Sequence, residues 1–226
     1  YVLKGGDMVQ VCLDECRKDN LVGFVSLRMN DVHVLASADD PKNKSTDSVS
    51  RFYVEHPEYR LGEEKGQPSS WVKLLQNWAI PQVRNYKYEI IKEICLNYNI
   101  SGLELDFIRA AGYFRQKETT SAQRKMIMTG FIKKVRQVLD EGAKEGQYRW
   151  LCVRIPDHPD NYDYMGIDPA MMYEAGVDMF VSSGSYYIQQ QNGIRQLRAM
   201  VPKASIYEEV HYVTSTVKTQ DKKVYG

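Results

Sequence analysis

Two acidic side chains stand two residues apart in the segment Gly102-Leu103-Glu104-Leu105-Asp106-Phe107. The segment is typical of a buried strand, where side chains alternate between faces, so Glu104 and Asp106 point to one side and the leucines to the other. Two carboxylates on an inner face are costly unless they are paired or used in chemistry. Asp106 stands at the C-terminal end of the strand, where parallel α/β proteins place their reactive groups. We expect Asp106 to be a nucleophile or acid/base residue, unless it only caps the next loop or pairs with Arg109.

Cleavage of a bond between sugars needs a second carboxyl group, because one group protonates the leaving oxygen while the other attacks carbon or activates water. Glu208 and Glu209 are the best partners, since their strand follows that of Asp106 by three and can face it across a barrel mouth. Either Tyr207, Glu209 and His211 or Glu208 point inward, and the sequence leaves both phases open. The alternative is an exposed pair of glutamates at a strand end.

Further polar side chains at strand ends, and one aromatic side chain of the long loop region before a helix, are expected to contact a substrate. Arg28, Glu104 and Arg154 form either an ion-paired structural cluster or part of the binding site. Asn30 and His33 can donate hydrogen bonds to hydroxyl groups, and Trp78 can stack on a sugar ring unless it is only a hydrophobic staple. In segment 177–183 we expect Phe180 and Ser182 on the inner side. The expected substrate-binding residues are Arg28, Asn30, His33, Glu104, Arg109, Arg154, Trp78 and His211.

Helix and strand patterns alternate along the chain. Strand-like segments lie at 21–28, 102–107, 149–155, 177–182 and 205–211, and helical periodicity or caps mark the intervening stretches. Five strands separated by helices predict a parallel sheet with right-handed crossovers. No Gly-rich phosphate loop follows a strand, which speaks against an open nucleotide-binding sheet. Polar inner positions favour a (β/α)8 TIM-type barrel, incomplete at its termini because a full barrel has about 250 residues.

The bulk composition restricts the partners. The chain has 226 residues and a net charge of +1, so we expect one barrel domain over 1–226 and neither nucleic acid nor membrane insertion. Because it begins at Tyr1 and not at Met, we expect a piece of a longer chain. Its four cysteines form no CxxC pair, and the acidic loop at 157–163 lacks the spacing of a calcium loop. We therefore expect no metal and no cofactor, and an acidic loop that faces the substrate.

The ordered motifs resemble a family. The segment 102–109 resembles the DG(I/L)xxDxxR strand of glycoside-hydrolase-like (β/α)8 barrels, which are found mostly in bacteria, and the segments 26–33, 56–59 and 78–84 are similar to that group as well. The match covers about residues 6–210. The resemblance implies a catalytic barrel that acts on an oligo- or polysaccharide outside the cell or in the periplasm, with Asp106 as the strand-end aspartate.

Two other functions remain open for such a barrel. One is a carbohydrate-binding barrel without turnover, which would keep the same core. The other is a barrel enzyme of different chemistry. The second is weakened because no Lys lies within a strand to form a Schiff base and no Gly-rich loop after a late strand suggests phosphate capture.

Overall fold

The structure of the protein, a computed structural model, describes residues 5–31, 49–63, 72–184 and 193–209. In chain order its elements are α1 (Met8–Lys18), β1 (Phe24–Arg28), α2 (Arg51–Glu55), η3 (Pro57–Tyr59), η4 (Val72–Leu74), α3 (Pro81–Asn97), β2 (Gly102–Asp106), α4 (Ser121–Glu141), β3 (Trp150–Pro156), η5 (Pro159–Asn161), α5 (Tyr162–Met165), α6 (Pro169–Glu174), β4 (Met179–Ser183), α7 (Ile194–Met200) and β5 (Ser205–Glu208).

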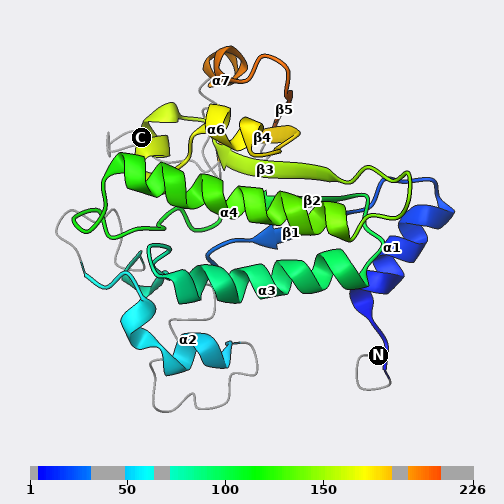
Figure 1. The fold of residues 1–226 in the computed structure, drawn as a ribbon, viewed down its shortest axis with the longest axis horizontal. Helices are drawn as coiled ribbons and strands as arrows, with labels where there is room; N and C mark the ends of the chain where they lie inside the picture. The colour runs from blue at the N-terminus through cyan, green and yellow to red at the C-terminus, as the bar shows by residue number, and fades with distance from the viewer. Residues whose placement is uncertain (1–4, 32–48, 64–71, 185–192, 210–226) are drawn as a thin grey trace, which may run out of the picture.

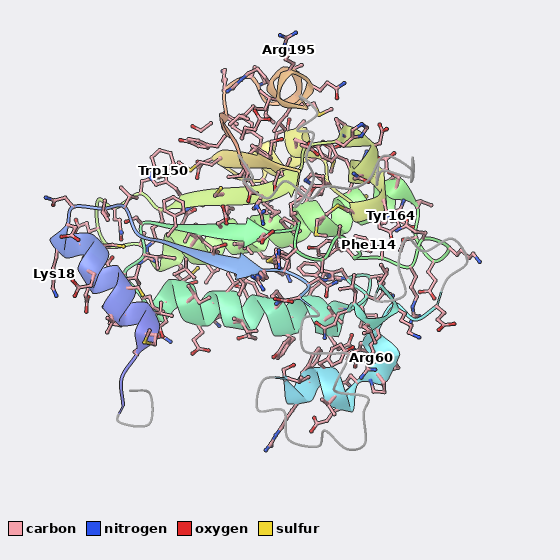
Figure 2. The ribbon with its side chains drawn as sticks, turned by 180° about the vertical axis from the view of Figure 1, so that it is seen from behind. Lys18, Arg60, Phe114, Trp150, Tyr164 and Arg195 are labelled. Carbon is pink, nitrogen blue, oxygen red and sulfur yellow. The ribbon has the colours of Figure 1, made fainter. Side chains whose placement is uncertain are left out.

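The five strands form one parallel sheet in the order β1-β2-β3-β4-β5, with β1 and β5 at its edges. A doubly wound sheet reverses its strand order at a switch point, and this order does not reverse. Helices α3 and α4 lie side by side over one face of the sheet (Figure 1). The view from behind in Figure 2 looks onto the opposite face. The prediction of an α/β fold with five parallel strands separated by helices is therefore confirmed.

The core lies between the sheet and the helices that cover it. Alternate side chains of the strands point toward the helices, which present apolar residues every three or four positions. Because these side chains are removed from water, their burial is the main force that holds the helices on the sheet. The fully buried members include Leu103, Leu105, Leu151, Val153 and Phe180 from the strands and Ile91, Cys95, Met128, Ile132 and Val135 from the helices.

Short polar side chains fix where the helices begin. Asp7 accepts a hydrogen bond from the backbone of Gln10 at 3.1 Å, and Asp168 accepts one from Met171 at 3.0 Å with Pro169 as the first helical residue. Thr120 opens α4 with a reciprocal capping box. Asp7 and Asp168 are therefore the N-caps of α1 and α6. Strand β1 begins later than expected, at Phe24.

At the N-terminal end of the sheet, the ring of Phe24 occupies the space that a side chain at Gly102 would fill. Phe24 pairs in register with Gly102, which pairs with Trp150, so the three positions share the face that bears Glu104. A Cβ atom on Gly102 would stand 2.4 Å from the ring of Phe24. The ring of Phe24 therefore lies across Gly102 on the inner face.

Replacing either of two glycines in the α4 region by alanine is expected to change the stability of the protein, in opposite directions. Gly130 is exposed within α4, and a Cβ added there would meet no atom within 4 Å, whereas a Cβ on Gly142 would stand 2.1 Å from the carbonyl oxygen of Cys95. We expect Gly130→Ala to stabilise the protein by up to about 1 kcal/mol, because alanine is the better helix former. We expect Gly142→Ala to destabilise it by about 1–3 kcal/mol, because the backbone must move. Urea unfolding of both variants measures this, and equal changes would contradict the packing of α4 against α3.

Candidate functional site

The strand register brings polar side chains of distant segments into rows on the inner face. Ser26 pairs with Glu104, which pairs with Cys152, and one step nearer the C-terminal ends Arg28 pairs with Asp106, which pairs with Arg154. The second row continues through the following strands to Val181 and Tyr207. Side chains within one row lie on the same face of a sheet. The inward direction expected for Arg28, Glu104, Asp106 and Arg154 is therefore confirmed.

The phase of the last two strands decides which glutamate reaches the site. Tyr207 is in register with Val181 of the inner face, and Glu209 follows in the same phase. Glu208 pairs with Ser182, whose neighbour in phase, Phe180, is packed in the core under the helices. The inner positions expected for Phe180 and Ser182 were wrong, because β4 places them on the helix side. Glu208 is exposed on that same side, so its expected catalytic role is wrong too.

Arg154 is the centre of the site. Its Nη1 donates to Asp106 Oδ2 at 2.9 Å and its Nε to Glu209 Oε2 at 2.7 Å. Its Nη2 donates to Ser183 Oγ at 3.0 Å and also contacts Glu209, and Ser183 donates to Glu209 in turn. The side chains of Asp106, Arg154 and Glu209 are 6, 13 and 28% exposed. One guanidinium thus holds two carboxylates in a largely buried network (ion pairs of this kind are far less screened than surface pairs).

The planar shape of the guanidinium separates the two acids. Glu209 binds the edge formed by Nε and Nη2, whereas Asp106 binds Nη1 on the other side of the group. Because the donors of arginine lie in a rigid fork, the guanidinium occupies the space between the two carboxylates. A sugar bond cannot lie between these acids unless Arg154 moves.

The second oxygen of Asp106 is also in use. Its Oδ1 accepts a hydrogen bond from the backbone N–H of Ile108 at 2.8 Å. Asp106 therefore caps the next loop, as one alternative expected, and it forms an ion pair with Arg154. Behind it, Tyr113 is fully buried and donates to the carbonyl of Phe107 at 3.1 Å. Burial and the nearby Asp106 charge raise the pKa of Tyr113 well above its usual value.

Glu104 lies deeper along the same strand among neutral groups. Its Oε1 accepts from the hydroxyl of Ser26 at 2.7 Å, and its Oε2 lies 3.8 Å from the thiol sulfur of Cys152. Burial, with a contribution from Glu104, raises the pKa of the Cys152 thiol. Cys152 is therefore a protonated donor here and no nucleophile.

A cavity of about 620 Å³ opens over these rows. It combines carboxylates, guanidinium groups, a hydroxyl and one apolar side chain, which is a lining suited to a polar ligand with hydrogen-bonding groups. Asp106, Glu209 and half of the expected substrate-binding residues line it. The lining consists of Ser26, Arg28, Glu104, Asp106, Arg109, Arg154, Val181 and Glu209.

Two expected substrate-binding residues are structural instead. Asn30 is 4% exposed, and its amide nitrogen donates to the carbonyls of Gln76 and Gly112 at 3.0 and 2.7 Å while its oxygen accepts from Gln76 N–H at 3.1 Å. Trp78 is completely buried and packs edge-on against neighbouring aromatic rings. Both expectations were wrong, because distant loop segments close over Asn30, and Trp78 packs in the core against Tyr113 and against Phe131 of α4.

Arg28 stands at the rim of the cavity. Its Nη1 donates to Asp31 at 2.7 Å, and its carbonyl oxygen accepts from Lys87 Nζ of α3 at 3.1 Å. Of the two alternatives for Arg28, Glu104 and Arg154, the ion-paired cluster is therefore wrong, since each of the three has different partners. His33 and His211 lie outside the described residues.

The described ranges contain no group of three or more His, Cys, Asp or Glu side chains that could hold a metal ion. The acidic loop after β3 forms η5 and α5, where His158 lies 3.4 Å from Asp160. Among the helices of these ranges none has the length and apolar character needed to cross a bilayer.

Sequence reasoning missed Ser183 and Val181. Both belong to β4, whose residues carry no polar alternation that reveals which side faces inward. Because Ser182 and Ser183 are adjacent, one serine lies on each face of the strand, so the sequence does not show which face points inward. The available signal was the position of Ser183 at the C-terminal end of its strand, level with the end of β3.

No protein-family model and no curated protein sequence matches the chain. Solved structures to which it is similar include an α-amylase of Geobacillus thermoleovorans in complex with acarbose, with 17% identity, 76% of this chain and 33% of that one covered, and a TM-score of 0.42. A protein of Bacillus subtilis described as a putative sporulation-specific glycosylase, YdhD, has 15% identity, 91% and 57% coverage and a TM-score of 0.47. A noncanonic maltogenic α-amylase of Thermotoga neapolitana, AmyB, has 16% identity, 88% and 40% coverage and a TM-score of 0.49.

The chain thus spans between a third and somewhat over half of the length of these proteins. The function itself has to be argued from the side chains of the site.

Lys87, which donates to Arg28 at the rim of the cavity, makes the stability of the protein depend on pH. Burial lowers its pKa to about 8 from 10.5, and nearby Asp31 opposes this only in part. Between about pH 8 and 10.5 the Lys87 amine is therefore protonated in the unfolded chain but deprotonated in the folded chain. The contribution of Lys87 to the free energy of unfolding rises with pH over that window. We expect the stability of the wild type relative to Lys87→Met to increase by on the order of 1–3 kcal/mol across it.

Urea unfolding of both proteins at neutral and alkaline pH measures this difference. Lys133→Met, at an exposed position of α4, serves as the control for losing a surface amine. A difference between the wild type and Lys87→Met that stays constant with pH would contradict the burial of this amine.

Proposed function

We propose that the protein is a glycoside hydrolase that acts on an oligo- or polysaccharide through Asp106. The observation that carries the proposal is the placement of Asp106. This nearly buried carboxylate stands at the C-terminal end of β2, is fixed by Arg154 and by the Ile108 N–H, and opens into a cavity of about 620 Å³. A carboxylate held in one orientation is suited to attack on carbon or to activation of water.

Glu209 is the second acid of the proposed mechanism. It lines the same cavity, at the end of β5, and is more exposed than Asp106. With a glycan bound, the guanidinium of Arg154 leaves the space between the two acids and keeps its contact with Asp106. The two carboxyl groups then take the nucleophile and acid/base roles that cleavage of a glycosidic bond requires.

The proposal extends to the fold. We propose that the five strands belong to a (β/α)8 barrel, in a single domain over residues 1–226. It is supported by the strand order, by helices on one face and by polar rows on the other. Action outside the cell or in the periplasm is part of the same proposal.

One observation favours a second function, carbohydrate binding without turnover. Arg154 lies between Asp106 and Glu209 and satisfies both carboxylates, with Ser183 completing the network. If this network persists when a sugar binds, the acids serve to hold Arg154 and the cavity only recognises its ligand. Turnover separates this function from hydrolysis.

The test is hydrolysis of a broad glycan panel by the wild type and by Asp106→Asn. We expect the substitution to lower turnover by several orders of magnitude, about 10³-fold or more, because a covalent or acid/base role cannot be met by an amide. We expect glycan binding to persist, since the amide keeps the size of the side chain. Product release is measured by reducing-end assay, and binding by calorimetry.

Glu208→Gln is the matched control, because this glutamate is exposed on the opposite face and should leave turnover unchanged. Equal turnover in wild type and Asp106→Asn would remove Asp106 from the mechanism. Measurable binding without hydrolysis of any glycan would establish the second function.

A further inference from the structure

The carboxylates of the cavity differ in their partners. Asp106 and Glu209 share the guanidinium of Arg154, and Arg28 at the rim is paired with Asp31. Glu104, on the same face of β2 as Asp106, contacts a hydroxyl and a thiol. Among the described residues no cation contacts Glu104.

Keeping the charged Glu104 carboxylate at this position without a cation beside it costs free energy. Glu104 is only partly exposed, and the walls of a cavity screen a charge less than open water does. Hydrogen bonds from the neutral donors Ser26 and Cys152 compensate its desolvation only in part. The arginines around it cannot supply the missing charge without giving up partners, since Arg154 and Arg28 are ion-paired and Arg109 is engaged as well.

A ligand can supply the cation instead. The cavity reaches from Glu104 to Asp106 and Glu209, so a sugar held near the strand ends can direct one substituent toward Glu104. An ammonium group there would form a charge-assisted hydrogen bond, which is about twice as strong as a neutral one. A neutral hydroxyl would leave the carboxylate charge uncompensated, and a carboxylate substituent would be repelled.

We propose that the cavity is selective for a glycan that carries a positively charged amine, an amino sugar, and that Glu104 is the counter-ion which recognises it. The proposal rests on the proposed function, because it names the substrate class of that same site. In it Ser26 and Cys152 orient the carboxylate, while Arg154, Asp106 and Glu209 hold the rest of the sugar.

The test compares three β-1,4-linked tetrasaccharides that differ only at carbon 2, made of glucosamine, glucose or N-acetylglucosamine. Calorimetry at mildly acidic pH, where the amine is charged, gives the affinity of each for the wild type and for Glu104→Gln. We expect the wild type to bind the glucosamine oligomer about tenfold more tightly than the other two, a difference of about 1.4 kcal/mol that added salt reduces. We expect Glu104→Gln to remove this preference.

Two variants separate charge from structure. Ser26→Ala removes one hydrogen bond to Glu104 and keeps the carboxylate, so it should retain the preference even if it weakens binding overall. Glu208→Gln removes a carboxylate from the opposite face and should change nothing. Binding of the glucose oligomer to Glu104→Gln, together with an unchanged circular dichroism spectrum, shows that the variant is folded.

Each remaining outcome overturns the proposal. These are equal affinity for the three oligomers, no binding of the glucosamine oligomer, and a preference that survives in Glu104→Gln. Loss of hydrolysis in Glu104→Gln with no change in binding would make Glu104 a proton donor instead. Hydrolysis of neutral glycans through Asp106 would leave the proposed function standing while this inference fails, whereas a glycan panel without any binding would remove both.

Discussion

The salt-bridge network around Arg154 is the interaction on which the inner face depends. It joins Asp106 at the end of β2, Arg154 of β3, Ser183 of β4 and Glu209 beyond β5, so one guanidinium links the C-terminal ends of four neighbouring strands. Removing one member of a buried ion pair leaves an uncompensated charge, which costs about 3–5 kcal/mol. The same network joins the strands near their C-terminal ends and orients the acids that face the cavity. Architecture and chemistry therefore share one set of side chains.

The loops above the sheet are held by a different kind of contact, from side chains to backbone. Arg115, in the segment after β2, donates to the carbonyls of Glu58, Arg60 and Leu61, and Asn30 joins the ends of two further segments. Backbone groups in loops lack the regular partners of helices and strands, so buried ones need such donors. These donors thus hold the loop segments in place through hydrogen bonds within the protein.

Most of the fold could be predicted from the sequence because strand and helix patterns alternate repeatedly along the chain. The alternation around Glu104 and Asp106 fixed the inner phase of β2, and Arg154 fixed that of β3. The phases of β4 and β5 could not be read, because these short strands place polar and apolar residues on both sides and only pairing with β3 distinguishes Val181 from Ser182. Asn30 and Trp78 were misread for a related reason. Their burial depends on segments far along the chain, namely the loop at Gly112 for Asn30 and helix α4 for Trp78. A polar or aromatic residue looks the same in the sequence whether a distant segment covers it or not.

The contact between Phe24 and Gly102 determines how deep the site can be. The ring occupies the volume that any other residue at position 102 would need, and it lies one row of the inner face below Ser26 and Glu104. The lining of the cavity ends at Ser26 and Glu104, one row above the ring. Gly102 has a hydrogen atom where every other amino acid has a side chain, and this lets the ring of Phe24 lie there. The position of the ring limits how far the site extends along the strands, and with it the size of the group that can contact Glu104.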